Sequence, residues 1–378
     1  MYFHGSILKQ ALQTSFSRQY FHPVHGVSAI AFTSLFLILR SLVSAARYTD
    51  RICYPEYYQQ PINNPIYITG NPRSGTTFLH RLLTEDRHFT YTKLYHTIFP
   101  AITFYRIFSS LSAIDRNIGG RLSKLVNWLD RQGFRGWDSI HKTQLNRAEE
   151  DEQLFMFTLL SPVITLLFPY YQELEESLWV DRLPQPTRHR LMSYYIDCLQ
   201  RHLYATGSEK TLLIKNTTST GRLRSTIAAL PQVCIIHMVR HPYECIPSLL
   251  SMYAASWNTF VRKKKVRSQA NLHLAQLYAS YYRERMQIFR EFSHNYPDQF
   301  LEISYQDLVN SPLSAIERIY QKFDLKLNEL TYARFQQVTD AAKHYKSQHS
   351  YSLEKFGIDR KMLYEQMPDV FDYYGFES

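Results

Sequence analysis

The chain of 378 residues is long enough to bury a substantial core, and no Gly/Ser-rich or Pro-rich linker divides it. Its four cysteines form no Cys-x-x-Cys pair and have no histidine at zinc-finger spacing, which is typical of a reducing compartment. The net charge of +10 favours an anionic cofactor, an acidic substrate or a negative membrane surface, and no nucleic-acid-binding motif accompanies it. We therefore expect a cytoplasmic protein without a metal or a nucleic-acid partner. Its domain covers residues 61–378 and follows an N-terminal helical extension over 1–60.

The N-terminal extension holds an uncharged apolar run. Residues 24–39 contain no Lys, Arg, Asp or Glu, and the apolar character continues to residue 46 across Arg40. A membrane span needs about 20 apolar residues, so this run is short for a span, and Arg40 argues against a signal peptide. Three alternatives stay open: a peripheral helix at a membrane surface through residues 24–46, which is favoured, a helix buried against the domain, or a true span. Basic residues after the run favour the inner face of the membrane.

A phosphate-binding loop follows. A β-prone run at 66–69 leads into Gly-Asn-Pro-Arg-Ser-Gly-Thr-Thr at 70–77, and apolar residues at helical spacing continue from 78 to 83. A strand, loop and helix in this order aim backbone N–H groups and the positive end of the helix dipole at one point. Nucleoside-triphosphate enzymes place a lysine after the second glycine, where this chain has Thr76, so the charge of the loop comes from Arg73. The sequence predicts a phosphate site that does not handle a γ-phosphoryl group.

Later segments indicate an α/β fold. Helical patterns cover 99–130, and the acidic cluster 149–152 opens an apolar stretch to residue 168. Two continuous apolar runs that each follow a helical segment, 211–214 and 233–239, are typical of buried parallel strands, and 300–305 is a further strand candidate. The predicted fold class is α/β, with a P-loop-type central parallel sheet flanked by helices after the N-terminal helical extension.

A second basic site is expected beside the loop. Arg240 comes directly after the run 233–239, and Ser248 lies about two turns into the helix that follows. Ligands of open α/β sheets bind beyond the carboxyl ends of the strands, so Arg240 and the loop should open to the same side. An arginine and a hydroxyl in this arrangement can hold one phosphate together.

The loop, Arg240 and Ser248 resemble the nucleotide-binding signatures of the sulfotransferase superfamily. From about residue 60 to the C-terminus the chain is similar to its bacterial-type, Stf3-like family, through 146–152, Lys215 with 221–223, and 345–357. The resemblance implies 3′-phosphoadenosine 5′-phosphosulfate (PAPS) as co-substrate, with Arg240 and Ser248 on its 3′-phosphate. The residues that it places on the 5′-phosphosulfate are Arg73, Ser74, Gly75, Thr76 and Thr77. Further predicted cofactor-binding residues are Tyr305 and, in a late loop that resembles the one closing over the nucleotide, Lys346 and Ser347.

Sulfuryl transfer needs no metal in principle, because phosphate is already a good leaving group. Cationic groups near the bridging oxygen help the reaction, and Arg73 and Lys215 can supply them. The acceptor hydroxyl must lose a proton to a base, for which His96 is favoured and the cluster 149–152, with Glu150, is the alternative. His96 stands where many relatives have a glutamate, and the other catalytic histidine of the family is replaced by Ser219. The predicted catalytic residues are His96, Lys215, Arg73 and Glu150.

Two other functions stay open. A membrane-associated nucleotide-binding protein without catalysis is favoured only by the departures at His96 and Ser219. A P-loop kinase is disfavoured by Thr76 and by the lack of a magnesium-binding carboxylate after a strand. The acceptor is predicted to be a hydroxyl of a small molecule, lipid or carbohydrate, and the aromatic segments 99–137 and 168–171 weakly indicate an apolar pocket. The oligomeric state is left open.

Overall fold

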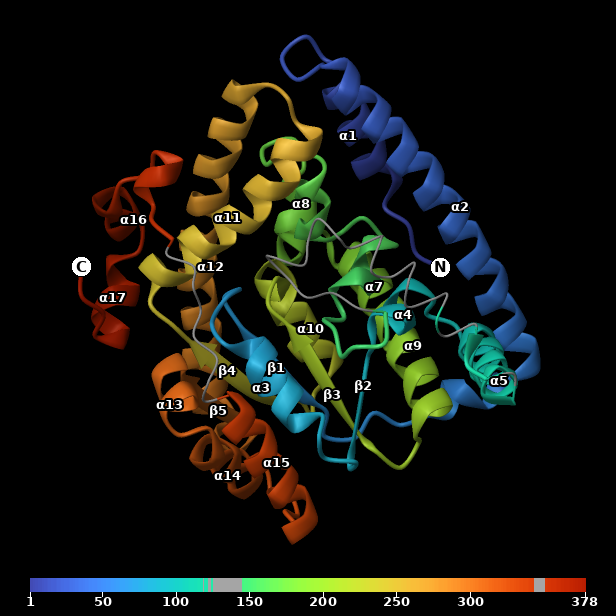
Figure 1. Ribbon diagram of the computed structural model, residues 1–378. Helices are drawn as coiled ribbons and strands as arrows, with labels where there is room; N and C mark the ends of the chain where they lie inside the picture. Colours follow the sequence, from blue (N-terminus) through green and yellow to red (C-terminus); the bar gives the residue numbers. More distant parts are fainter. Residues whose placement is uncertain (118, 122–123, 125–144, 343–350) are drawn as a thin grey trace.

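The centre of the fold is a parallel β-sheet (Figure 1). The computed structural model describes residues 1–117, 119–121, 124, 145–342 and 351–378. In this part of the chain five strands pair in the order β2–β3–β1–β4–β5, all of them parallel. Their bounds are β1 Ile66–Gly70, β2 Phe89–Tyr91, β3 Thr211–Asn216, β4 Cys234–Val239 and β5 Phe300–Ser304. The predicted α/β class and the four predicted strand runs are confirmed.

The edge strand β2 is the one that the sequence does not predict. It has three residues, Phe89 to Tyr91, and pairs only with β3, where Phe89 is opposite Thr211. Three residues are too few for a period-2 or continuous apolar pattern, and pairing with β3 makes the segment a strand.

Side chains of the strands alternate between two helical layers. Ile66 and Ile68 of β1 belong to the core cluster on one face, whereas Tyr67 belongs to the cluster on the other. The first face is covered by α3 (Thr76–Leu83), α13 (Tyr305–Asn310), α14 (Pro312–Lys322) and α15 (Glu329–Ala342). The second is covered by α9 (Gln185–Thr206), α10 (Leu223–Ala229) and the C-terminal part of α12 (Lys264–Asn295).

Further helices extend the molecule beyond the carboxyl ends of the strands. α11 (Pro242–Phe260) packs along the N-terminal part of α12, and both share a core cluster with α16 (Arg360–Gln366) and α17 (Pro368–Tyr374). Shorter helices complete this region: α4 (Leu94–Ile98), α5 (Ile102–Asn117), α7 (Glu152–Met156) and α8 (Glu175–Leu178). The pattern expected over 99–130 is therefore helical as far as Asn117, and most of its remainder lies outside the described residues.

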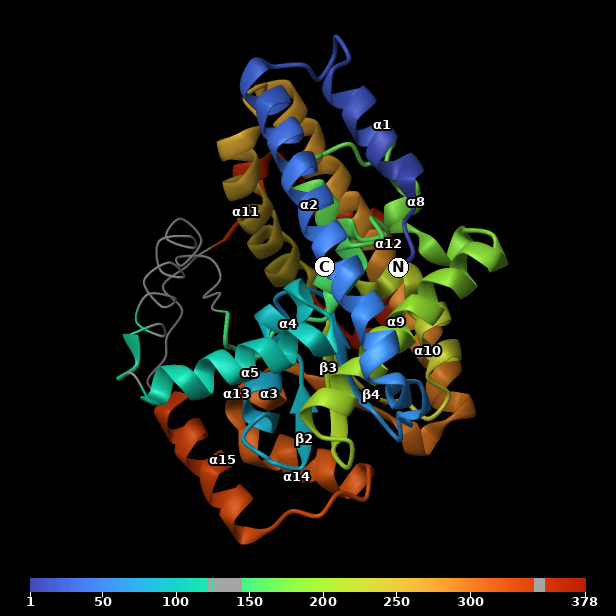
Figure 2. The same ribbon diagram turned by 90° about the vertical axis from the view of Figure 1, so that its right-hand side faces the viewer.

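The N-terminal helices α1 (Gly5–Ser15) and α2 (Pro23–Cys53) lie against the same domain (Figure 2). Ala29 and Val43 of α2 share the core cluster of α9. The buried carboxylate of Asp50 accepts hydrogen bonds from Arg201 Nε of α9 at 2.9 Å and from the backbone N–H of Thr103 of α5 at 2.8 Å. Among the residues described, α2 is the one helix long and apolar enough to cross a membrane, by length and composition alone.

Candidate active site

The phosphate-binding loop connects the end of β1 to the start of α3, as the sequence predicts. A Cβ atom on Gly70 would lie 2.5 Å from the carbonyl oxygen of Met238 in β4, so only glycine fits there. The loop then turns through two left-handed residues, Arg73 with φ 73° and Gly75 with φ 90°. A left-handed arginine is strained, and such strain is concentrated at ligand sites.

Tyr305 closes one side of the loop. A Cβ atom on Gly75 would lie 2.9 Å from Cδ2 of Tyr305, so the tyrosine ring lies directly against the glycine. The guanidinium of Arg240 stacks over the same ring at 3.8 Å from its centre. The Tyr305 ring therefore contacts both the phosphate-binding loop and Arg240, and so helps to fix the distance between them.

The loop and the second basic site are joined directly. Arg73 Nε donates a hydrogen bond to Ser248 Oγ at 3.0 Å, and Arg240 Nη1 donates to the carbonyl oxygen of Arg73 at 2.7 Å. Ser248 lies on α11, which begins just after Arg240 at the end of β4. Glu244, in the first turn of α11, accepts from Arg240 Nε at 2.6 Å. The structure therefore brings Arg73, Arg240 and Ser248 together at the carboxyl edge of the sheet.

The residues of this region fit an anionic nucleotide. The first N–H groups of α3 have no partner within the helix and point from its positive end. The buried Ser74 hydroxyl has no hydrogen-bond partner in the described part of the chain, and a phosphate oxygen would supply one. Arg73 and Arg240 add positive charge on the same side.

Lys215 lies at the end of β3, next to the loop. Its buried Nζ donates to the Thr77 hydroxyl of α3 at 3.1 Å and forms an ion pair with Glu150 at 3.2 Å. Glu149 Oε1 is 3.8 Å from the same nitrogen. Glu150 also accepts from the Thr217 hydroxyl at 3.0 Å. The predicted lysine and one predicted carboxylate are therefore neighbours at the start of α3.

The acidic cluster 149–152 divides into two pairs with different environments. Asp151 and Glu152 point into the core, where both accept hydrogen bonds from the amide nitrogen of Asn216 at 2.7 and 2.9 Å. Glu152 is paired with the buried Arg222. Burial raises the pKa of Asp151 to about 7, although hydrogen bonds from Tyr195 and Asn216 oppose the shift. This pair stabilises the fold behind the site, and the pair Glu149 and Glu150 faces Lys215.

His96 lies in an aromatic cluster. It is 5% exposed, its ring centre is 4.4 Å from that of Tyr105 and 4.9 Å from that of His202, and its Nδ1 accepts from the backbone N–H of Lys93 at 3.2 Å. Burial, with smaller contributions from His202 and Lys93, lowers the pKa of His96 to about 2. The ring is therefore neutral and resists protonation in this environment.

Three further residues in this region are not predicted from the sequence: Thr217, Glu244 and His80. Thr217 positions Glu150, and Glu244 pairs with Arg240 at a spacing of four residues that the sequence could have revealed. His80 of α3 is buried, and its two ring nitrogens have no hydrogen-bond partner among the described residues. Burial, reinforced by Lys215, lowers the pKa of His80 to about 3. No local pattern distinguishes His80 from an ordinary core position.

Two predicted cofactor-binding residues, Lys346 and Ser347, lie outside the described residues, as do residues 125–137 of the aromatic segment 99–137 that is expected to line an acceptor pocket. The described part of the chain contains no group of three or more His, Cys, Asp or Glu residues arranged to hold a metal ion.

The parallel sheet, the loop without a lysine and the joined basic residues define a P-loop α/β transferase. The chain belongs to the sulfotransferase family, whose sequence profile matches residues 65–329. It is a transferase enzyme with sulfotransferase function.

Named relatives agree with this assignment. Over 316 residues the chain is 26% identical to the omega-hydroxy-beta-dihydromenaquinone-9 sulfotransferase Stf3 of Mycobacterium bovis, covering 83% of this chain and 75% of the relative. The crystal structure of sulfotransferase STF1 from Mycobacterium tuberculosis H37Rv matches with a TM-score of 0.71 at 20% identity, covering 96% and 90% of the two chains. That of sulfotransferase STF9 from Mycobacterium avium matches with a TM-score of 0.70 at 16% identity, covering 100% and 98%. The two structures support the fold.

Proposed function

We propose that the enzyme transfers a sulfuryl group from PAPS to a hydroxyl group of a small-molecule, lipid or carbohydrate acceptor. The observation that carries the proposal is the direct link between two anion-binding elements. Arg73 of the phosphate-binding loop donates to Ser248, and Arg240 donates to the Arg73 carbonyl. A donor with phosphates at both its 5′ and 3′ positions requires two such elements at a fixed distance.

Each basic element has its own part in donor binding. Arg73, Ser74, Gly75, Thr76 and Thr77 would hold the 5′-phosphosulfate with backbone N–H groups, hydroxyls and one guanidinium. Arg240 and Ser248 would hold the 3′-phosphate, with Tyr305 between the two elements; Lys346 and Ser347 stay predicted members of the site.

Lys215 is proposed to stabilise the leaving group. The donor, when bound, supplies a sulfuryl group attached to a phosphate. The Nζ of Lys215 reaches the first turn of α3 through Thr77, so its charge lies where the phosphate-binding loop begins its helix. A buried cation is more effective in stabilising developing negative charge than an exposed one, since water does not screen it.

Glu150 is proposed as the base, ahead of His96. Its carboxylate contacts Lys215, whereas His96 is enclosed by Tyr105 and His202 and resists protonation. A base must lie within hydrogen-bond reach of the reacting proton, and contact with Lys215 puts Glu150 nearer to that position. This choice reverses the order that the sequence favours.

Among the three acceptor classes, a lipid hydroxyl has particular support. The Mycobacterium bovis relative acts, by its name, on an omega-hydroxylated dihydromenaquinone, which is an apolar molecule that ends in a hydroxyl group. A screen of lipid and glycan extracts with 35S-labelled PAPS would test the acceptor class. Labelling of peptides alone would contradict all three.

Calorimetry with adenosine 3′,5′-bisphosphate tests the donor site. We expect tight binding of the bisphosphate without magnesium, and Ser248→Ala should weaken it about tenfold because a charge-assisted hydrogen bond is lost. The same variant should lose less affinity for adenosine 5′-monophosphate, since Arg73 then loses only its hydrogen bond to Ser248, and Ser251→Ala on the same helix is a matched control. Preference for magnesium-ATP over the bisphosphate would overturn the proposal in favour of a kinase.

A further inference from the structure

The outer side of α2 is an apolar stripe. Ala29, Phe36 and Val43 face the core, whereas Val27 and Leu35 on the opposite side are each 68% exposed and Ile38 is 59% exposed. Other exposed apolar residues on this side are Val24, Ile30 and Leu42. Surface helices of soluble proteins place charged residues on the side that faces water, but residues 23–39 contain none. The stripe therefore needs an apolar partner.

The inner side of α2 is fixed to the protein. Arg40 Nη2 donates to the Met1 carbonyl at 2.9 Å, and Asp50 forms a buried ion pair with Arg201 at 2.9 Å. Crossing a bilayer would expose these charged groups to hydrocarbon, at a cost of several kcal/mol each. The contacts favour a helix that lies along a membrane surface over one that crosses it.

A cluster of basic residues lies at the N-terminal end of this stripe. We call it the basic corner; it consists of Arg18, Arg262, Lys263, Lys264 and Lys265. Lys263 Nζ donates to the carbonyl oxygens of Arg18 at 3.1 Å and Gln19 at 2.9 Å, which ties the α11–α12 loop to the α1–α2 loop. Figure 1 and Figure 2 both show these two loops side by side. The charge of the loop is therefore held next to the start of the apolar stripe.

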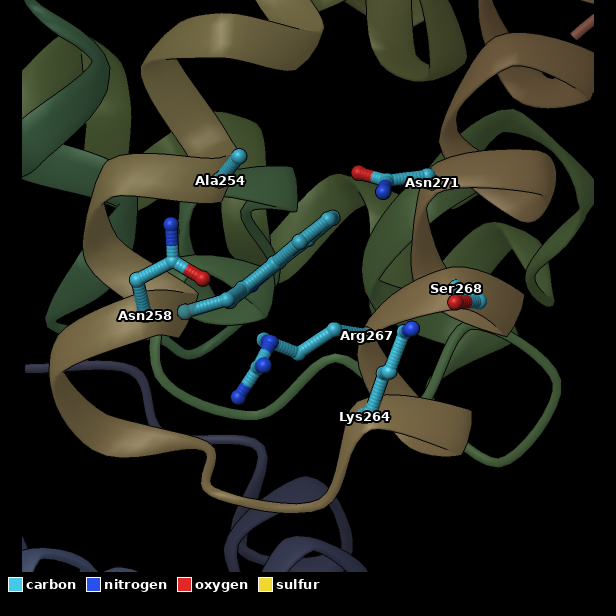
Figure 3. Close-up of a pocket in the computed structure, with 7 residues that line it drawn as sticks. Ala254, Asn258, Lys264, Arg267, Ser268 and Asn271 are labelled. Atoms are coloured by element: carbon cyan, nitrogen blue, oxygen red, sulfur yellow. The ribbon is translucent and has the colours of Figure 1, made fainter. Parts of the chain in front are cut away.

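Two hollows border Lys264. One of about 440 Å³ is lined by Gln19, Lys263, Lys264, Lys265, Val266 and Gln269. The other, of about 170 Å³, lies between α11 and α12, where Figure 3 shows Asn258 on one side and Lys264, Arg267 and Asn271 on the other. Arg267 fixes the loop by donating to the Val261 carbonyl at 2.6 Å. Lys264 and Lys265 are both exposed, so their charge is accessible to an anion.

We propose that the apolar stripe of α2 and the basic corner form one docking surface for an anionic phospholipid bilayer. Lysines attract the negative head groups, and the stripe enters the boundary between head groups and acyl chains. Apolar burial or charge alone gives weak binding, whereas the combination gives stable peripheral attachment. The proposal does not depend on the donor or the acceptor of the reaction.

Vesicle co-sedimentation of the full chain tests the proposal without measuring activity. We expect binding to vesicles of phosphatidylcholine with phosphatidylglycerol, weaker binding to phosphatidylcholine alone, and weakening by salt. Replacing Lys263, Lys264 and Lys265 by Gln should weaken binding roughly a hundredfold, since each basic residue contributes about fivefold. Replacing Val27, Leu35 and Ile38 by Ser should weaken it by about tenfold or more, on both kinds of vesicle.

Matched controls use exposed residues elsewhere. Lys210, Lys326 and Lys361 replaced by Gln, and Val309 and Leu330 replaced by Ser, should leave vesicle binding unchanged. Circular dichroism and urea unfolding establish that each variant is folded. Absence of binding to anionic vesicles, or equal binding by the variants and the wild type, would overturn the proposal. So would a dimer that the Val27, Leu35 and Ile38 variant converts to a monomer, because the stripe would then be covered by a second copy.

Discussion

Glu150→Gln provides the sharpest test of how the acceptor loses its proton. Glutamine keeps an oxygen for the hydrogen bond from the Thr217 hydroxyl, which is 3.0 Å from the carboxylate, so the fold around the site should persist. What disappears is the basicity of the group that lies 3.2 Å from Lys215 Nζ. A positioned base contributes about 10²–10⁴ in rate, so we expect kcat to fall by that factor, equivalent to about 2.7–5.5 kcal/mol of transition-state stabilisation.

The assay is transfer of 35S-sulfate to a lipid-extract acceptor, with affinity for adenosine 3′,5′-bisphosphate measured in parallel. Bisphosphate affinity should change less than about threefold, because Glu150 contacts Lys215 and Thr217 and not the two arginines. His96→Asn is the comparison, since its amide oxygen can still accept from the Lys93 N–H. It should lose some stability but keep kcat within a fewfold. The opposite result, a large loss in His96→Asn with full activity in Glu150→Gln, would refute the reasoning.

Three predictions concern the fold behind the site. Asp151 has a pKa raised to about 7, above its unfolded value near 4, so the native state binds the extra proton, and the stability that this group contributes, about 4 kcal/mol, is lost as pH rises from about 4 through 7. Buried histidines such as His80 and His96 affect wild type and variant alike, so the measurement is the difference in the free energy of unfolding by urea between the wild type and Asp151→Asn, which should fall over this pH range. Gly221→Ala should destabilise the protein by more than about 4 kcal/mol in the same assay, because its Cβ would lie 1.7 Å from the Leu178 carbonyl oxygen. Asp50→Asn should lower the free energy of unfolding by about 3 kcal/mol, because it removes one of the two carboxylates that pair with the buried Arg201 and leaves only Asp197.

Matched variants give each of these predictions a control. Gly357→Ala meets no atom within 4 Å and should cost only about 1 kcal/mol for its left-handed backbone, so equal losses at Gly221 and Gly357 would contradict the steric argument. Asp307→Asn on the exposed surface is the comparison for Asp50. If the difference in the free energy of unfolding between the wild type and Asp151→Asn does not fall as pH rises from about 4 to 8, Asp151 is ionised in the native state.

The parallel sheet and the phosphate-binding loop could be predicted because their signals are local. The Gly-x-x-x-x-Gly spacing and continuous apolar runs mark β1, β3 and β4, and β5 is a further strand candidate. The position of Arg240 follows from the rule that ligands bind at the carboxyl ends of strands. The three-residue β2 carries no comparable signal, because its pairing depends on β3, more than a hundred residues later.

The division of the acidic cluster could not be predicted for a different reason. Four consecutive acidic residues lead into α7, which begins at Glu152, and the path of the chain through that turn decides which of them face Lys215 and which point into the core. His96 illustrates the same limit, since its burial comes from Tyr105 and His202, and His202 lies on α9. Chemical type indicates what a residue can do, and tertiary contacts decide whether it has access to the reaction.

The two partners of the Asp50–Arg201 ion pair are synthesised at different times. They are separated by 151 residues, so at 5–20 residues per second the ribosome delivers Arg201 about 8–30 s after Asp50. During that interval α2 has been made, while α9, which pairs with Asp50 and shares the core cluster of α2, has not. We expect the nascent helix to need a temporary apolar shelter, from a chaperone or a lipid surface, before the rest of the enzyme is synthesised.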